Sequence, residues 1–241
     1  MSKKGQRKHQ KRLSVTGALK LPRKTEPWVV NPTSGPHSKE SCIPLSVLLR
    51  DYLELARTAR EANTILGNGD VKVDGVVRKD PRFPVGFMDI IQINKSENNW
   101  RVIYDEKGYL ALNEIPDEEA EFKLAKIEGK QPFKGGKTQL AFHEGRTKIG
   151  DFQDFKVGDV VKLSLPEFEI EDHLPKEEGK IALITGGSNV GKVGKILEIN
   201  KREGTSKELI SLEGKEENYQ APENYVFIIG EEESLISIRG E

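Results

Sequence analysis

The chain has 241 residues, of which 35% are hydrophobic and 32% are charged. This balance favours several small domains over one deep core and argues against a large catalytic domain. A single cysteine, Cys42, excludes an intrachain disulfide, and four scattered histidines without paired cysteines predict no zinc site. No apolar run approaches the roughly 20 residues of a membrane span. We therefore expect a soluble cytoplasmic protein without a metal or other cofactor.

Positive charge is concentrated at the N-terminus, although the formal net charge is only -1. Residues 1 to 24 contain nine Lys and Arg and no Asp or Glu, which leaves 38 - 9 = 29 basic against 39 acidic residues in the rest of the chain. Such segregation is typical of a protein that meets a polyanion with one surface. The alternative is a disordered solubilising tail, against which the apolar Trp28, Val29 and Val30 argue.

Residues 1–42 are predicted to be a basic arm and linker. The segment is rich in Lys, Arg, Pro, Ser and Gly, has almost no hydrophobic periodicity, and is expected to order only against its partner. Trp28 is a candidate for stacking on a base, although a lone tryptophan also serves to pin a linker to a core. The candidate contacts in this segment are Lys3, Lys4, Arg7, Lys8, Lys11, Arg12, Lys20, Arg23, Lys24, Trp28 and His37.

Two helices are predicted after Ile43. Apolar residues at helical spacing predict the first from Pro44 to Ala56, with Arg50 and Arg57 on one side and outside its apolar stripe. Thr58 and Glu61 have the spacing of a capping box at the start of the second. Gly67 or Gly69 is the natural end of this helix.

A tight hairpin follows in "VKVDGVV", where Asp74 and Gly75 suit the positive φ angles of a two-residue turn. Together with the two helices and the predicted strand "MDIIQI", it forms a unit that we place at residues 43–98. Short alternating runs then predict an all-β module at 99–175, and a further set of strands predicts a small barrel-like β domain at 176–230. Residues 231–241 are left as a C-terminal tail.

The stretch "ITGGSNVGKVG", from Ile184 to Gly194, is close to a phosphate-binding loop. Such a loop needs Ser or Thr after its lysine and a helix directly behind it. Position 193 is Val, and the residues that follow have strand-like spacing. A glycine-rich turn between two strands explains the same letters, because it allows close approach of the backbone and Lys192 to a partner. We therefore expect no nucleotide substrate.

Residues 43–91, "IPLSVLLRDYLELARTAREANTILGNGDVKVDGVVRKDPRFPVGFMDII", resemble the S4 RNA-binding domain. The glycine-rich turn resembles the KOW motif of RNA-binding and ribosomal proteins, with Gly179, Gly187, Gly191 and Gly194 at the positions of its glycines. The order of modules, including "KKGQRKHQKRL", "WVVNPTSGPHSKESCIPL" and "KGGKTQLAFHEGRTKIGDF", is similar to the archaeal and eukaryotic ribosomal family S4e. The resemblance runs from Lys3 to about Ile229.

The resemblance implies a mainly β, multi-domain structural protein of the small ribosomal subunit. It implies a basic arm, an S4 domain with two helices and a hairpin, a central β domain and a C-terminal KOW domain with an SH3-like barrel. Its partners would be small-subunit ribosomal RNA and neighbouring ribosomal proteins. Besides the arm, the candidate RNA contacts are Arg50, Arg57, Arg60, Lys72, Arg78, Lys79, Arg82, Lys134, Lys137, Arg146, Lys148, Lys192 and Lys195.

Two other functions are compatible with parts of the sequence. S4 domains also occur in RNA-modifying enzymes, but the β segments here carry neither a nucleophile motif nor a cofactor fingerprint. A KOW-bearing transcription or elongation factor is the second alternative, and neither the basic arm nor the S4-like unit fits that class. No residue is therefore assigned a catalytic role.

Overall fold

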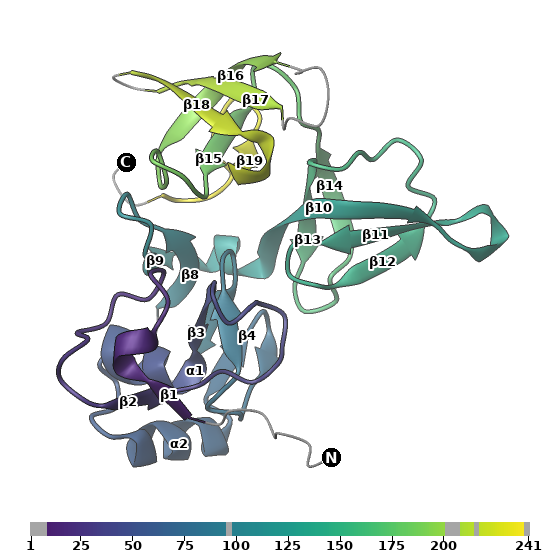
Figure 1. Cartoon of the computed structure of the whole chain (residues 1–241). Helices are drawn as coiled ribbons and strands as arrows, with labels where there is room; N and C mark the ends of the chain where they lie inside the picture. Colours follow the sequence, from purple (N-terminus) through teal and green to yellow (C-terminus); the bar gives the residue numbers. More distant parts are fainter. Residues whose placement is uncertain (1–8, 95–97, 201–207, 215–216, 239–241) are drawn as a thin grey trace, which may run out of the picture.

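The computed structural model describes residues 9–94, 98–200, 208–214 and 217–238. Its strands form three five-stranded antiparallel sheets and two short strand pairs. Figure 1 shows the helix-containing unit at the bottom, the central sheet at the right and the C-terminal sheet at the top. The expectation of a mainly β protein with one small α+β unit is confirmed. No helix in the described residues is long and apolar enough to cross a membrane.

The first predicted helix is shorter than expected. β3 (Cys42–Pro44) pairs with β6 (Pro84–Gly86), and a turn of α1 (Leu45–Val47) continues into the π-helical η2 (Leu48–Tyr52). The chain then leaves the helix, with Glu54 at φ 55°. Arg57 therefore precedes the second helix instead of lying on the first. Ala56 is buried, as its spacing predicted, although the backbone around it is irregular and not helical.

The second helix, α2 (Ala59–Asn68), has the predicted ends. The Thr58 hydroxyl accepts a hydrogen bond from the Glu61 amide, and the Glu61 carboxylate accepts one from the Arg57 amide at 2.8 Å. Gly69 ends the helix in the left-handed conformation, with φ 81°. Side chains and a glycine thus satisfy backbone groups that a helix leaves unpaired.

The first sheet extends further than predicted. It contains β4 (Val71–Val73), β5 (Val76–Val77), β7 (Ile90–Ile93), β8 (Asn99–Tyr104) and β9 (Leu110–Ile115), in the order β5-β4-β7-β8-β9. Asp74 and Gly75 have φ of 51° and 74°, as the tight turn requires. β8 and β9 were expected in the central module, but β8 pairs with β7 and satisfies its free backbone edge. The sheet thus crosses the boundary predicted at residue 98.

The N-terminal segment is folded onto this unit from residue 9 onwards. β1 (His9–Lys11) and β2 (Trp28–Val30) form a strand pair, with the 3₁₀ turn η1 (Arg12–Ser14) between them. Val15, Leu19 and Leu21 are buried in the main hydrophobic core. The prediction that residues up to 42 order only against a partner is therefore wrong for residues 9–42. These three apolar side chains are irregularly spaced and give no periodic signal in the sequence. They are buried because they pack on a core formed by other parts of the chain.

The central sheet has the order β12-β11-β10-β13-β14. The turn η3 (Asp117–Glu121) leads into it, and η4 (Lys134–Gly136) lies at the end of its long hairpin. One face has a separate core that includes Ile127, Leu140 and Phe142. Its strands are β10 (Phe122–Pro132), β11 (Thr138–Phe142), β12 (Thr147–Gly150), β13 (Val160–Ser164) and β14 (Ile170–Leu174).

The C-terminal sheet has the order β18-β17-β16-β15-β19, and its apolar side chains join the main core. The ring of Phe227 packs edge-to-face on Phe87 from the first unit, with centroids 5.0 Å apart. Its elements are β15 (Ile181–Ile184), β16 (Val193–Asn200), β17 (Leu209–Glu213), β18 (Asn218–Pro222), η5 (Glu223–Tyr225) and β19 (Val226–Gly230).

The glycine-rich loop joins β15 to β16 and is followed by a strand, as expected for a strand-loop-strand element. Its close approach is to this chain itself. A Cβ placed on Gly191 would lie 2.6 Å from the carbonyl carbon and oxygen of Asp105, in the turn between β8 and β9. The loop therefore fastens the C-terminal sheet to the first sheet.

Replacing Gly191 by Ala is expected to lower the free energy of unfolding more than the matched change Gly136→Ala. Both glycines have positive φ, 80° and 74°, so each substitution carries a cost of about 1–2 kcal/mol for the left-handed backbone. Only at Gly191 must neighbouring backbone also move, since no atom lies within 4 Å of a Cβ at Gly136. Chemical denaturation of both variants measures the difference, and equal losses would contradict the contact.

Candidate nucleic-acid interface

The N-terminal segment presents part of its basic charge to solvent. Lys11, Lys20, Arg23 and Lys24 are exposed, and so is Trp28, directly across the strand pair from Lys11. Exposed ammonium and guanidinium groups around an aromatic ring are suited to phosphates and bases. Lys3, Lys4, Arg7 and Lys8 lie outside the described residues.

Two predicted contacts in this segment point inward. Arg12 is 4% exposed; its Nε donates to the Pro22 carbonyl oxygen at 2.6 Å, and its guanidinium pairs with Asp51 at 3.6 Å. His37 is buried, with Nε2 3.0 Å from a carboxylate oxygen of Asp89. Both side chains tie the N-terminal segment to the helix-containing unit, which leaves neither exposed to a partner.

The helix-containing unit divides its cations in the same way. Arg57, Arg60 and Lys79 are exposed, around the start of α2 and just after β5. The partly buried members are Arg50, Lys72, Arg78 and Arg82.

Three of these partly buried arginines have partners within the fold. Arg78 lies over the ring of Phe83, 4.5 Å from its centroid, Arg82 donates to the Asn31 carbonyl oxygen at 2.8 Å, and Arg50 pairs with Asp51. The three exposed side chains are therefore the stronger candidates for a phosphate contact.

The central sheet also has two pairs of cations, one exposed to solvent and one in contact with other side chains and backbone of the fold. Lys134 and Lys137 are exposed at the end of the β10–β11 hairpin. Arg146 lies 3.4 Å from the centroid of the Phe168 ring and pairs with Glu144, while Lys148 donates to the Phe168 carbonyl oxygen. The hairpin end is therefore the accessible basic site of this sheet.

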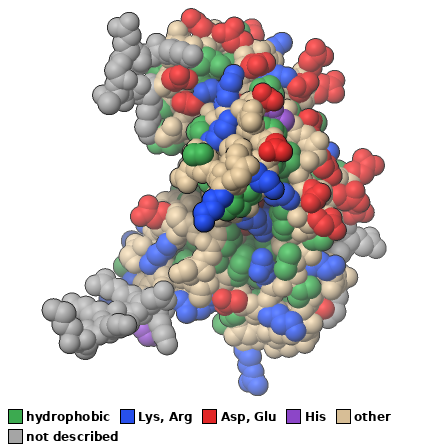
Figure 2. All heavy atoms as spheres, turned by 90° about the vertical axis from the view of Figure 1, so that its right-hand side faces the viewer, with side chains coloured by type: hydrophobic (Ala, Val, Ile, Leu, Met, Phe, Trp, Pro, Cys, Tyr) green, Lys and Arg blue, Asp and Glu red, His purple; other side chains and the backbone are tan. Residues whose placement is uncertain are grey.

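The last part of the chain is rich in glutamate. Residues 208–241 contain nine Glu against one Lys and one Arg. Lys192 lies over the ring of Tyr219, with Nζ 4.4 Å from the centroid, whereas Lys195 on β16 is exposed. Figure 2 shows Asp and Glu side chains over the upper part of the molecule, where the C-terminal sheet lies, and Lys and Arg more often over the middle and lower parts. This distribution explains how a near-neutral chain retains basic surfaces.

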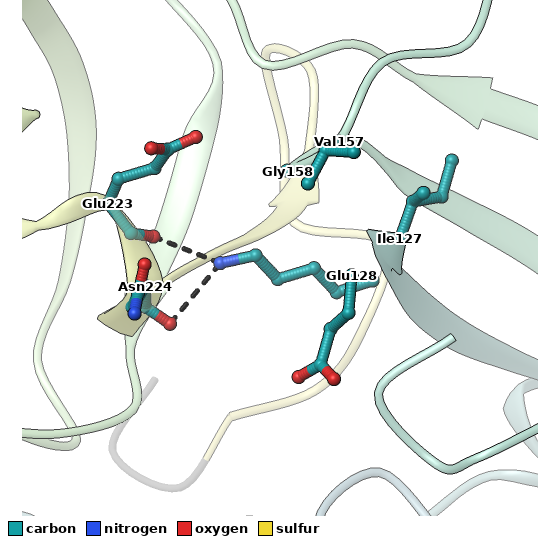
Figure 3. A pocket seen from close by; sticks show the side chains of 7 residues that line it. Ile127, Glu128, Val157, Gly158, Glu223 and Asn224 are labelled. Atoms are coloured by element: carbon teal, nitrogen blue, oxygen red, sulfur yellow. Dashed lines mark hydrogen bonds between the residues drawn. The ribbon is translucent and has the colours of Figure 1, made fainter. Parts of the chain in front are cut away.

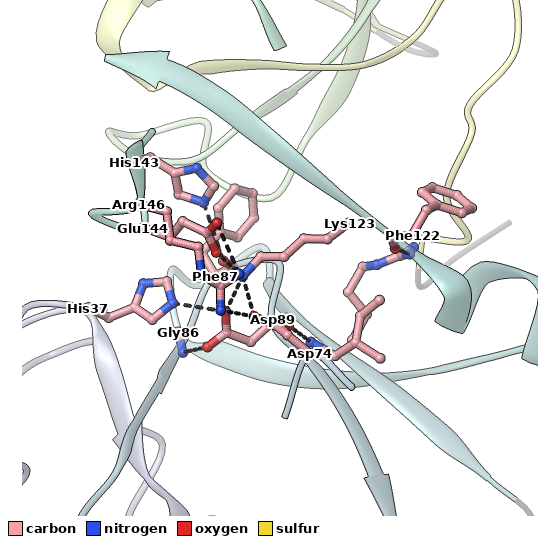
Figure 4. A network of polar contacts seen from close by, with 12 residues as sticks. His37, Asp74, Gly86, Phe87, Asp89, Phe122, Lys123, His143, Glu144 and Arg146 are labelled. Atoms are coloured by element: carbon pink, nitrogen blue, oxygen red, sulfur yellow. Dashed lines mark hydrogen bonds and ion pairs between the residues drawn. The ribbon is translucent and has the colours of Figure 1, made fainter. Parts of the chain in front are cut away.

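A buried ion cluster, which sequence analysis missed, joins the first unit to the central sheet (Figure 4). The ammonium of Lys123, on β10, is fully buried and pairs with Asp74 at 2.9 Å, with Asp89 at 2.5 Å and with Glu144. The three carboxylates present oxygens within 4.8 Å of one another, a spacing that a bound cation can occupy. Here the Lys123 ammonium lies among them and supplies the positive charge.

The cluster is held by mutual charge compensation. Burial alone would lower the pKa of Lys123, but the three carboxylates raise it above its usual value. Burial raises the pKa of each carboxyl, and it is the largest single influence on Asp89 and Glu144. The pKa values of these two are nevertheless lowered, because the Lys123 charge acts together with His37 on Asp89 and with Arg146 on Glu144, and hydrogen bonds add to both. Asp74 keeps a raised pKa because desolvation dominates there. Unpaired charges at this depth would cost several kcal/mol each.

His143 lies at the edge of the cluster and is neutral in the folded protein. Burial, followed by the nearby Lys123 charge, lowers the pKa of His143 to about 4. Its Nδ1 accepts a hydrogen bond from the Lys126 amide at 3.2 Å, which requires an unprotonated nitrogen.

A groove of about 380 Å³ lies between the central and C-terminal sheets (Figure 3). Lys126 crosses it, and its ammonium donates to the carbonyl oxygens of Glu223 and Val226 at 2.9 and 2.7 Å. Glu128, Val157 and Gly158 also line the groove. Lys126 thus joins the two sheets by binding the end of η5.

Replacing Lys123 by Met is expected to lower the free energy of unfolding by about 3–5 kcal/mol, because three buried carboxylates lose their cation. Lys162→Met is the matched control on the adjacent strand. Its pair with Glu171 at 3.2 Å is partly exposed, with the two side chains 29% and 44% accessible, so the expected loss is below about 1 kcal/mol. Equal losses in urea denaturation would show that the cluster does not stabilise the fold.

The free energy of unfolding is also expected to decrease as the pH is lowered, because His143 is protonated more readily in the unfolded chain than in the folded one. The unfolded chain binds a proton there below pH 6.5, and the folded chain only near pH 4. Between these values the contribution of His143 is lost at about 1.4 kcal/mol per pH unit. In His143→Gln this contribution is absent, so its pH profile is expected to be flatter. Parallel profiles for His143→Gln and the unchanged protein would exclude this role.

Comparison with known proteins shows the family of the chain. The profile described as "Ribosomal family S4e" matches residues 96–170, that of the RS4NT (NUC023) domain matches residues 4–40, and that of the S4 domain matches residues 44–91. The S4 match coincides with the unit predicted from residue 43. These three ranges end before the predicted KOW segment, which stays a prediction.

Relatives align along nearly the whole chain. The small ribosomal subunit protein eS4 of Methanosphaera stadtmanae is 44% identical over 241 residues and covers 100% of both chains. That of Archaeoglobus fulgidus is 45% identical over 226 residues and covers 94% of each. The crystal structure of 30S ribosomal protein S4e from Thermoplasma acidophilum, 39% identical, superposes with a TM-score of 0.70 over 79% of this chain and 96% of that one. These relatives are ribosomal proteins and not enzymes, and this chain belongs to the ribosomal protein family S4e.

Proposed function

We propose that this chain is a structural constituent of the small ribosomal subunit, located in the cytoplasm, and binds ribosomal RNA through its N-terminal segment and its S4 domain. Full-length similarity to small-subunit proteins carries this proposal. The exposed cations on both parts support it, because phosphate neutralisation and counterion release supply most of the sequence-independent affinity for a nucleic acid.

The two surfaces suit a folded RNA target. Lys11, Lys20, Arg23 and Lys24 belong to a segment that is packed on the S4 domain, and Arg57, Arg60 and Lys79 belong to the domain itself. Since the buried Arg12 fixes one to the other, the cations have defined relative positions. Fixed cations recognise the shape and phosphates of an RNA junction better than a base sequence.

The C-terminal sheet and the hairpin end of the central sheet are given further roles in the same function. We propose that the C-terminal sheet is a KOW domain with an SH3-like barrel, and that its acidic surface faces solvent or neighbouring ribosomal proteins. Exposed Lys134 and Lys137 at the hairpin end would reach a second RNA segment, and Lys195 is a further candidate contact. Through these contacts the protein would contribute to subunit assembly and translation.

Replacing Lys11, Lys20, Arg23 and Lys24 together by Gln is expected to weaken binding to small-subunit RNA. The slope of log affinity against log salt should flatten by roughly three to four, because about four phosphate contacts are lost. These side chains are exposed, so the fold is retained. Filter binding across a salt series measures both quantities.

The matched control replaces Glu231, Glu232 and Glu233, all exposed, by Gln and should not weaken binding. If the unchanged protein fails to bind small-subunit RNA even at low salt, the proposed function is wrong. If it binds but the quadruple variant keeps the full salt slope, the N-terminal segment is not the electrostatic anchor.

A further inference from the structure

Trp28 is an exposed aromatic side chain at the start of β2, across the strand pair from the polar strand β1. It is 53% exposed, the highest fraction among the aromatic side chains in the described part of the chain. The expectation that a lone tryptophan pins the linker to the core does not hold, because Val15, Leu19 and Leu21 do this instead.

The strand pair places Lys11 and His9 of β1 beside the Trp28 ring. Lys11 and Trp28 are direct cross-strand partners, so their side chains share one face of the pair. The Lys11 ammonium lies 5.8 Å from the centroid of the Trp28 ring. The His9 ring meets Trp28 at 5.8 Å and 60°, an edge-on contact. These contacts orient the ring and leave about half of its surface open.

The opposite face of the strand pair is anchored to the S4 domain. Gln10, between His9 and Lys11, is buried, and so is Arg12, whose amide donates to the Pro27 carbonyl oxygen at 3.0 Å. The Arg12 guanidinium pairs with Asp51 of η2. The Trp28 ring is therefore carried on fixed backbone, and little conformational entropy is lost when a planar ligand stacks on it.

We propose that Trp28 is a stacking site for an unpaired base and that Lys11 neutralises a phosphate next to that base. A base within a duplex is already stacked on both faces, so an exposed ring recognises a single-stranded segment. A protein partner is disfavoured because a single ring flanked by basic groups offers little apolar area for an interface. The inference rests on the proposed function and adds the class of RNA bound at this site.

Tryptophan fluorescence tests the site directly. The sequence contains one other tryptophan, Trp100, which is half-buried on β8. The emission difference between the unchanged protein and Trp28→Phe therefore isolates Trp28. A short oligouridylate is expected to quench this difference signal, and a fully paired RNA duplex of equal length is expected to leave it nearly unchanged.

Affinity measurements separate stacking from charge. Trp28→Ala is expected to weaken oligouridylate binding by roughly 5- to 150-fold with an unchanged salt slope, as for the loss of one stacked base. Trp28→Phe should restore most of the affinity. Lys11→Gln should instead flatten the salt slope by about one. All three side-chain changes are at exposed positions, and thermal unfolding checks that each variant is folded.

An unquenched Trp28 signal, or an unchanged affinity of Trp28→Ala, overturns the stacking site, as does equal quenching by the duplex. If the protein still binds small-subunit RNA in that case, the proposed function stands and only this inference fails. Quenching by the oligouridylate without any binding to small-subunit RNA would support the stacking site and refute the proposed function.

Discussion

The buried ammonium of Lys123 is the interaction on which the arrangement of the domains depends. It lies on the first long strand of the central sheet, yet its partners Asp74 and Asp89 belong to the S4 domain. Asp89 also accepts from the Gly86 amide and contacts His37 of the N-terminal segment. One cation therefore joins three parts of the chain. Because partial satisfaction of such a cluster is costly, these parts have one favourable relative position.

The N-terminal segment uses its positive charge in two directions. Arg12 is turned inward, where its pair with Asp51 and its bond to a carbonyl oxygen compensate its burial. Lys11, one residue earlier, is turned outward beside Trp28. Within β1, strand alternation puts Lys11 on the face opposite the buried Gln10. The 3₁₀ turn that follows the strand then directs Arg12 inward. A basic segment can therefore be part of the fold and still present a surface to RNA.

The glycine-rich loop resembles a phosphate-binding loop in sequence but has a packing role. Gly191 gives its loop the positive φ and the absent Cβ that allow contact with the Asp105 backbone. Lys192 is drawn to the Tyr219 ring. The loop therefore acts in packing between sheets, and a strand instead of a helix follows it. Together with the Lys126 bridge, it holds the C-terminal sheet against the rest of the molecule.

Short-range signals in the sequence were sufficient for the local structure. Thr58, Gly69 and the Asp74-Gly75 turn behave as predicted because caps and tight turns are decided by a few adjacent residues. The match of the S4 domain follows from the same patterns. The length of the first helix was predicted wrongly, since the burial of Ala56 is compatible with helix and with irregular backbone.

Other features were decided only by tertiary structure. The docking of Val15, Leu19 and Leu21 and the extension of the first sheet by β8 depend on surfaces made elsewhere in the chain. The same holds for Lys123 and Asp74, which are 49 residues apart and which no periodicity connects. Lys and Asp are usually surface residues, so sequence alone indicates solvent for both. Burial of a charge becomes favourable only when the folded chain brings its counter-charges within hydrogen-bonding distance.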